Sequence, residues 1–280
     1  MKPRIFENKV LFLWEKMEKT EMKENRLTLY ELAPEVVAFS TTRHGGYSLG
    51  RYGEFNVNRY CGDNPADIRR NEELLARQLG IGIDRLVMPH QVHGDRVLKV
   101  DGGFLALPAA ERLQALEGFD AVMTSEKGVC VGVSTADCIP VLLYDSEKQA
   151  VCAVHAGWRG TVARIVVKAV GAMAEAYGTR PADLRAQIGP GISLESFEVG
   201  DEVYEAFVAA GFDMAGIARR QEKWHIDLPA CNRGQLLAAG VPSGAIGCCG
   251  VCTYQHPDTY FSARRLGIQS GRIFTGIVTR

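Results

Sequence analysis

The most regular hydrophobic pattern of the chain lies in residues 129–160, where short apolar runs alternate with polar turns. Val129–Ser134, Ile139–Tyr144 and Ala150–Val154 are apolar and rich in β-branched residues, and the polar segment Asp145–Gln149 separates the last two. Runs of this composition, about six residues long, favour strands over helices. Because polar residues do not alternate with apolar ones, we expect these strands to be covered on both faces. The last two runs are expected to form a hairpin.

The remaining periodicities predict helices and further strands around this segment. Asn64-Pro65 is typical of a helix start and predicts a helix that ends near Leu79, whereas Thr161 is expected to cap a helix over Val162–Tyr177. Further strands are expected at residues 27–32, 36–41, 86–89, 96–100, 119–124, 184–188, 224–228, 245–249 and 272–278, and further helices at residues 108–116, at 198–210 and after Asp227.

No internal repeat, low-complexity tract or linker divides the chain. We therefore expect one domain over residues 35–280, preceded by an N-terminal arm and the first strands in residues 1–34. Within this N-terminal part, Phe6–Trp14 predicts a short strand or a surface arm, and the charge-rich Lys16–Arg26 predicts a solvated connection.

Composition restricts the range of functions. Hydrophobic residues make up 46% and the formal net charge is −1, so the chain has the composition of a globular protein and predicts neither nucleic acid nor membrane as a partner. No apolar run approaches the ~20 residues of a membrane span. The charged N-terminal sequence has no signal-peptide pattern, so the eight cysteines favour reduced thiols or metal ligands, and a cytoplasmic location is expected. Cys249-x-x-Cys252 resembles half of a zinc ribbon, whose second pair is missing.

Three residues with metal-binding side chains lie at strand ends or turns beside small residues. Cys138 begins one strand of the expected hairpin and His155 ends the other, so strand pairing would bring them together. Alternation places His90 and His93 on opposite strand faces, and the neighbouring Gly94 favours His93, although either could be a hydrogen-bonded structural residue. A catalytic zinc site keeps three imidazole, thiolate or carboxylate ligands and one open position. The same donors could hold copper.

Two arginines are candidate anion ligands. Arg43 begins a glycine-rich loop within Phe39–Val57, which matches neither a P-loop nor a dinucleotide-binding fingerprint. Arg159 comes directly before the helix expected at residues 162–177, and the N-terminus of a helix beside an arginine favours a phosphate or carboxylate. The alternatives are a solvated arginine at position 43, and at position 159 one that caps a carbonyl or pairs with an aspartate.

A series of motifs resembles a known family. FSTTRHGGYS, QVHG, TADC, VHAGWRG, GPGI with FEVGDEV, CTY and FSARR, in this order, look like the YfiH-like, laccase-domain family from about Val36 onward. The resemblance implies a purine nucleoside phosphorylase of broad substrate range, with adenosine deaminase and methylthioadenosine phosphorylase activities; some members are described as copper-dependent polyphenol oxidases. It implies a zinc set formed by His93 of QVHG, Cys138 of TADC and His155 of VHAGWRG. The departures are the N-terminal arm, the insertion at residues 102–118 and the additional Cys248 and Cys249.

The resemblance also implies a fold. It is an α+β protein built as a four-layer α/β/β/α sandwich of mixed sheets, the cysteine hydrolase-like fold shared with certain toxins. Three functions therefore compete: a zinc enzyme acting on purine nucleosides and phosphate, a cysteine hydrolase with Cys138 as nucleophile and His155 as base, and a non-enzymatic module with a structural metal. Phosphate would be held by Arg43 or Arg159. The usual zinc deaminase signature is absent, so deamination would need another acid or base, for which Asp137 is a candidate.

Overall fold

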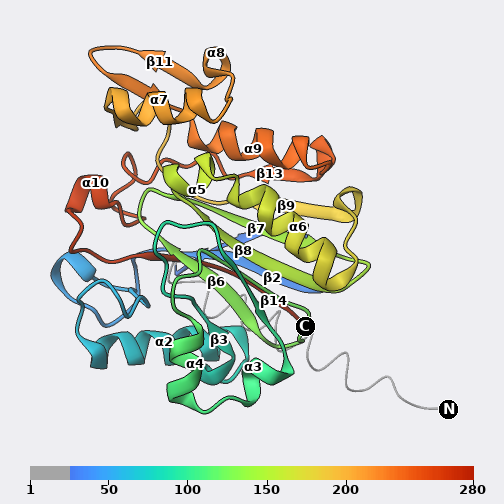
Figure 1. The fold of residues 1–280 in the computed structure, drawn as a ribbon. Coiled ribbons are helices and arrows are strands. Elements are labelled where there is room, and N and C mark those ends of the chain that lie inside the picture. Colours follow the sequence, from blue (N-terminus) through green and yellow to red (C-terminus); the bar gives the residue numbers. More distant parts are fainter. Residues whose placement is uncertain (1–25) are drawn as a thin grey trace.

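Two β-sheets packed face to face form the centre of the structure (Figure 1). The computed structural model describes residues 26–280. The strand predicted at Phe6–Trp14 lies outside these residues, as does the connection predicted at Lys16–Arg26 apart from its last residue. Both sheets contain parallel and antiparallel neighbours, which confirms the mixed α+β class. None of the helices within residues 26–280 is long and apolar enough to cross a membrane.

The first sheet has five strands and includes the last strand of the chain near its centre. In spatial order it contains β1 (Leu27–Tyr30), β2 (Val36–Thr41), β14 (Ile273–Thr279), β6 (Cys130–Thr135) and β3 (Leu86–Val87). Only β3 and β6 pair in parallel; the other neighbours are antiparallel. The sheet therefore joins the two ends of the described chain to the apolar segment at residues 129–160.

The second sheet has six strands and contains the predicted hairpin at its centre. In spatial order it contains β13 (Ile246–Cys248), β9 (Leu184–Ile188), β7 (Ile139–Asp145), β8 (Ala150–Ala156), β5 (Ala121–Thr124) and β4 (Val97–Val100). β7 and β8 pair over their full length with Ile139 opposite Ala156. A separate antiparallel sheet contains β10 (Glu198–Val199), β12 (Trp224–Ile226) and β11 (Ala218–Arg220).

The strands of the hairpin are covered on both faces, as their apolar pattern predicts. Leu142 and Tyr144 of β7 belong to the core between the two sheets. Val141 and Leu143, which alternate with them, pack instead in the core that includes residues of helices α6 (Ile165–Tyr177) and α9 (Leu228–Ala238). All seven residues of β7 are buried for this reason.

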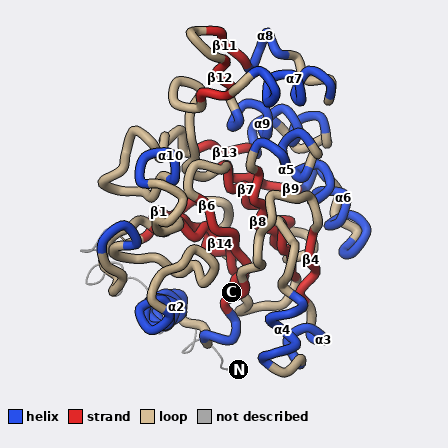
Figure 2. The backbone as a smooth tube through the Cα atoms, turned by 60° about the vertical axis from the view of Figure 1, so that its left-hand side comes forward, coloured by secondary structure: helices blue, strands red, loops and turns tan. Residues whose placement is uncertain are grey.

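Helices cover the outer faces of the sheets. Figures 1 and 2 show α2 (Pro65–Leu79) on the side of the strands opposite to α6. Leu75 of α2 packs with Phe39 and Phe274 of the five-stranded sheet. Asn64 caps α2 by accepting a hydrogen bond from the Ala66 amide, so the predicted helix start is confirmed. The remaining helices are α3 (Gly102–Ala106), α4 (Ala109–Ala115), α5 (Trp158–Val162), α7 (Asp201–Ala209), α8 (Met214–Ile217) and α10 (Ala263–Leu266).

One predicted helix start is wrong. Thr161 does not cap a helix over residues 162–177, because it lies inside the short helix α5, and Arg164 with φ 62° separates α5 from α6. A left-handed residue ends regular α-helix, and an arginine at that position gives no sequence signal. In the segment expected as a helix at residues 198–210, Glu198 and Val199 pair with β12, and α7 starts at Asp201 with Gly200 as its N-cap.

Pro140 lies inside the central strand β7, a position that proline rarely takes because it has no N–H for the ladder. Its carbonyl accepts a hydrogen bond from the amide of Gly189, directly after β9 ends at Ile188. The missing N–H of the proline therefore faces the end of the β7–β9 ladder, where few further backbone bonds would form. This position is equivalent to the strand ends that proline tolerates.

Candidate metal centre

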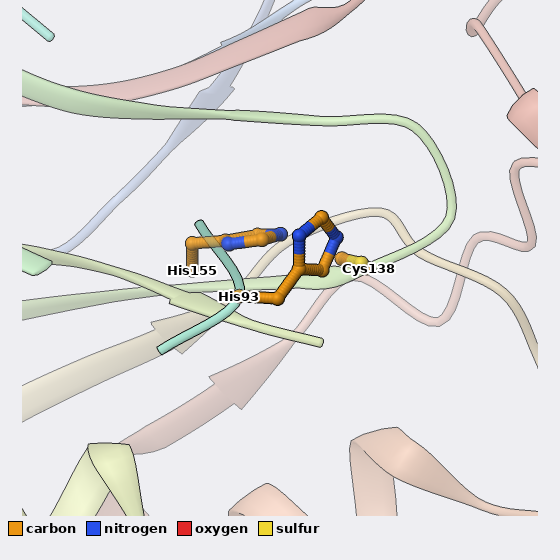
Figure 3. A group of neighbouring side chains, drawn as sticks. All are labelled: His93, Cys138 and His155. Atoms are coloured by element: carbon orange, nitrogen blue, oxygen red, sulfur yellow. The ribbon is translucent and has the colours of Figure 1, made fainter. Parts of the chain in front are cut away.

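Three side chains from distant parts of the chain converge beside the end of the β7–β8 hairpin (Figure 3). One possible ligand atom from each of His93, Cys138 and His155 lies within 4.8 Å of the other two. The His93 and His155 rings meet edge to face, with centroids 4.8 Å apart. His155 is buried, Cys138 is half-buried and His93 is exposed. The three residues predicted as metal ligands therefore form one group that reaches the protein surface.

The hairpin positions two of the three side chains. Because Ile139 pairs with Ala156 and Pro140 with His155, Cys138 lies one residue before the ladder, next to the position of His155 across it. This is the juxtaposition that the two apolar runs predict. Seven paired residues in each strand make this end of the sheet a rigid support.

Asp120 joins the hairpin to the loop that carries His93. Its Oδ1 lies 2.7 Å from Nδ1 of His155 and accepts a hydrogen bond from the His93 amide at 2.9 Å, while its Oδ2 accepts from the amides of Val92 and Gly94. The Asp120 carbonyl also accepts from the His155 amide. A carboxylate on Nδ1 directs the Nε2 lone pair of His155 toward the group, as in many metal sites.

The charges of these residues support one another. Burial alone would raise the pKa of the Asp120 carboxyl, but the hydrogen bond and charge of His155 and the amides of Gly94 and Val92 hold it below its usual value. Removal from water alone would raise the pKa of the Cys138 thiol, but the charges and hydrogen bonds of His155 and His93 lower it to about 6. The group therefore favours the thiolate, which is the form that binds metals.

His93, rather than His90, faces the group. His93 has φ 61° and lies in a turn between strands, so the strict alternation expected from the sequence does not apply to it. His90 instead lies 2.6 Å from Glu117 through its Nδ1 and stacks on Tyr60 with ring centroids 4.0 Å apart. The choice of His93 over its neighbour agrees with this geometry, whereas its role as a ligand stays a prediction.

Gly157 leaves the space that the group occupies. A Cβ atom on Gly157 would lie 3.0 Å from Cys138 Sγ and 3.1 Å from His93 Cδ2. Contacts this short force a neighbour to move, because sulfur and carbon do not approach so closely without a bond. A side chain at this position would therefore displace the Cys138 thiol and the His93 ring, which have to face each other in the group.

Arg43 lies beside a cavity in the glycine-rich loop. Its Nε donates to the Gly53 carbonyl and its Nη1 to the Pro257 carbonyl, and the guanidinium lies 5.1 Å from the Phe261 ring centroid. Its Nη2 has no hydrogen-bond partner among residues 26–280. The cavity has a volume of about 530 Å³ and is lined by Arg43 together with His44, Ser48, Glu54, Asp258 and three loop residues.

Arg159 is exposed, and its guanidinium lies 4.3 Å from the ring centroid of Trp158. No carboxylate of residues 26–280 forms an ion pair with it, so the pairing considered from the sequence is not found there. Its place in the first turn of the five-residue helix α5, rather than before a long helix, removes the helix argument for an anion at this position. Neither Arg43 nor Arg159 hydrogen-bonds to His93, Cys138 or His155.

The other residues singled out in the sequence have structural partners. Sγ of the buried Cys252 lies 3.4 Å from the Ser193 amide nitrogen and 3.5 Å from Ser196 Oγ. Within residues 26–280 the only group of three potential metal-binding side chains is that of His93, so the Cys249-x-x-Cys252 pair does not extend to a zinc ribbon. Both carboxylate oxygens of Asp137, the candidate acid or base, accept hydrogen bonds.

Sequence reasoning missed two residues that shape the group. Asp120 lies in the strand expected at residues 119–124 and Gly157 directly follows His155, but neither is singled out by the sequence. Asp120 lies 26 residues from Gly94 and 35 from His155, so no local spacing identifies its partners. Gly157 could have been suspected, because a glycine directly after a candidate ligand is a position where other groups approach closely.

The chain is similar to known proteins over most of its length. Residues 37–280 match the family model described as multi-copper polyphenol oxidoreductase laccase. The chain is 48% identical to a purine nucleoside phosphorylase of Bacteroides thetaiotaomicron, over 91% of this chain and 97% of that protein. It is 46% identical to adenosine deaminase RL5 of an unknown prokaryotic organism, over 86% and 93% respectively. The solved structure of the Bacillus licheniformis hypothetical protein YfiH has a TM-score of 0.86 at 29% identity and covers 91% of this chain and 97% of its own.

Proposed function

The chain belongs to the YfiH-like family, whose model is described as multi-copper polyphenol oxidoreductase laccase. From this premise we propose that the protein is a zinc-dependent purine nucleoside phosphorylase. Its substrates would be phosphate and adenosine, inosine or guanosine, and its products the free base and ribose 1-phosphate. Adenosine deaminase and S-methyl-5'-thioadenosine phosphorylase activities would accompany this reaction. The names of two relatives, a purine nucleoside phosphorylase and an adenosine deaminase, support the proposal. The four-layer sandwich and its relation to the cysteine hydrolase-like fold belong to the same proposal.

The convergence of His93, Cys138 and His155 is the observation that carries the proposal. Two imidazoles and one thiolate suit zinc, and a set of three protein ligands is typical of catalytic rather than structural sites. The surroundings of the donors also suit a metal ion. Asp120 fixes the orientation of His155, and the lowered pKa of Asp120 keeps its carboxylate charged. A bound zinc would supply Lewis-acid chemistry by polarising an oxygen of the phosphate or the sugar.

Phosphorolysis sets clear demands on the remaining residues. A phosphate oxygen bonds to the anomeric carbon of the ribose while the bond from this carbon to the purine nitrogen breaks, and the electron pair leaves with the base, which takes up a proton. The protein has to hold an anion beside the sugar, and charge-assisted bonds from arginine suit this task. We assign it to Arg43 or Arg159; the free Nη2 of Arg43 and its position beside a cavity favour Arg43.

A cysteine hydrolase is the main alternative, and one observation favours it. Asp120, His155 and Cys138 are linked in the order of a catalytic triad, and the thiol has a lowered pKa. The position of His93 argues for the metal, because a nucleophilic cysteine needs only one imidazole whereas a metal needs every donor that the group provides. A copper polyphenol oxidase, suggested by the description of the family model, would use the same three side chains.

Metal content and product identity test these assignments together. Purified protein is assayed for zinc and copper and then incubated with inosine or adenosine, with and without phosphate. The proposal predicts about one zinc per chain and release of free base only when phosphate is present. Inosine formed from adenosine without phosphate would identify the deaminase activity. Protein free of metal with full activity would contradict the zinc assignment, and bound copper with oxidation of a phenol would replace it.

A further inference from the structure

The turn that carries Cys138 has an unusual backbone. Asp137, directly before Cys138, has φ 90°, which non-glycine residues rarely adopt and which aspartate and asparagine tolerate best. Such a conformation persists only where the surrounding structure holds it, and it is concentrated at functional sites. The turn joins β6 of one sheet to β7 of the other, so its shape decides where the thiol of Cys138 points.

Three segments far away in the sequence hold Asp137 in place. Thr253 Oγ1 donates to its Oδ1 at 2.7 Å, and the Arg264 amide in the first turn of α10 donates to its Oδ2 at 2.7 Å. The Ile192 amide donates to its backbone carbonyl at 2.8 Å. A Cβ atom on Gly191 would lie 3.1 Å from that carbonyl oxygen and 3.2 Å from that of Cys138, so this segment packs directly on the turn.

The segments that hold Asp137 are themselves connected. The amide of Thr253 donates to the Gly191 carbonyl, and the side chain of Thr253 is fully buried. The guanidinium of Arg264 donates through both terminal nitrogens to the Glu198 carbonyl, which ties α10 to the small sheet. The contacts of Asp137 therefore extend into a network rather than ending at mobile side chains.

We propose that Asp137 is a positioning residue that fixes the Cys138 turn for metal binding through its hydrogen bonds to Thr253 and Arg264. This inference rests on the proposed metal site. It replaces the acid or base role considered for Asp137, because both carboxylate oxygens are engaged in holding the turn. The hydrogen bonds of Asp137, and not only its tolerance for positive φ, hold the Cys138 turn in the shape that metal binding needs.

Substitutions at both ends of one hydrogen bond separate these roles. Asp137→Gly keeps a residue that accepts positive φ but removes the carboxylate, whereas Asp137→Asn keeps the shape and an amide that can still accept from the Arg264 amide and donate to the Thr253 hydroxyl. Thr253→Val removes the hydroxyl without changing Asp137, and Thr253→Ser restores it. Thr124→Val is the matched control, because it removes a buried threonine bond of 2.8 Å to the Val100 carbonyl at the opposite end of β5 from Asp120.

The affinity for Co²⁺ is measured on metal-free protein by following the thiolate-to-cobalt absorption band. We expect Asp137→Gly and Thr253→Val to weaken binding by roughly 10- to 100-fold, as changes around metal ligands typically do. Thr253→Ser and Thr124→Val should bind like the wild type. Wild-type affinity in Asp137→Gly, or in Thr253→Val, would overturn the inference. If the Asp137 variants do not fold, the Thr253 pair still decides it.

A second readout works without any metal. Alkylation of Cys138 by iodoacetamide in metal-free protein is followed by mass spectrometry of its peptide. Its rate should differ from the wild type in Asp137→Gly and Thr253→Val but not in Thr253→Ser. Equal rates in all variants would contradict the positioning role. Failure of the wild type to bind Co²⁺ would count against the proposed zinc enzyme, whereas the alkylation rates would still decide the role of Asp137.

Discussion

The two parts of the candidate metal centre are built in different ways. Cys138 and His155 lie at the end of a hairpin whose backbone pairing brings them close together. His93 lies in a turn outside any strand, and its backbone is held by the carboxylate of Asp120. The hairpin is buried on both faces, whereas His93 is exposed.

This difference indicates where the centre is robust and where it is sensitive. A hairpin inside a six-stranded sheet keeps its register through many backbone hydrogen bonds and a buried core, so single side-chain changes at its end should leave the pairing of its strands intact. The turn with His93 depends on one side chain that accepts three amide hydrogen bonds. We therefore expect the loss of a ligand to abolish metal binding, and the loss of its support to weaken it.

The largest effect is expected from removing a hairpin ligand. Cys138→Ala and His155→Ala should lower zinc affinity by more than the roughly 10- to 100-fold typical of changes outside the ligand set, and phosphorolysis should fall with it. Zinc content and turnover of inosine are measured on protein whose fold is checked by circular dichroism. His90→Ala is the matched histidine control and should keep its metal, because His90 contacts Glu117 and Tyr60 instead. Zinc lost in His90→Ala but kept in His93→Ala would move the ligand to position 90.

A smaller effect is expected at the support of the His93 turn. Asp120→Asn replaces one carboxylate oxygen with an NH2 group, which cannot accept a hydrogen bond. The variant therefore loses either the bonds from the amides of Val92 and Gly94 or the bonds from His155 and the His93 amide. Zinc affinity, measured by competition with a chelator, should fall about 10- to 100-fold. Asp145→Asn is the control, because Asp145 is another buried aspartate that accepts two amide bonds, from Glu147 and Lys148, at the far end of β7. Equal affinities in the two variants would remove Asp120 from the centre.

The smallest of the three effects is expected from one added methyl group. Gly157→Ala would place a carbon 3.0 Å from Cys138 Sγ, so the ligand has to move and zinc affinity should fall. Gly171→Ala, in the exposed face of α6 with no atom near the added carbon, should instead raise the free energy of unfolding by about 0.5–1 kcal/mol. Affinity for zinc and the free energy of unfolding in urea are measured for both. Unchanged zinc binding in Gly157→Ala would show that the space beside the thiol is not needed.

The same comparison explains what could be predicted from the sequence. The apolar runs predict β7 and β8 and hence the proximity of Cys138 and His155, because pairing and burial are local properties of those segments. The choice of His93 needed Gly94 and the family resemblance, since a turn residue with positive φ leaves no periodic signal. Asp120 was not recognised because its partners come from two distant segments. The break between α5 and α6 was missed because the left-handed Arg164 is set by the fold rather than by its residue type.

The central claim is that one zinc ion is held by His93, Cys138 and His155. X-ray absorption at the zinc edge measures the ligand atoms of the bound metal directly in the purified protein. The predicted result is one sulfur at about 2.3 Å and two imidazole nitrogens at about 2.0–2.1 Å, with the remaining position taken by a lighter atom. A shell with two or more sulfur atoms would contradict the claim, because Cys138 is the only cysteine of the group and the metal would then lie elsewhere in the protein.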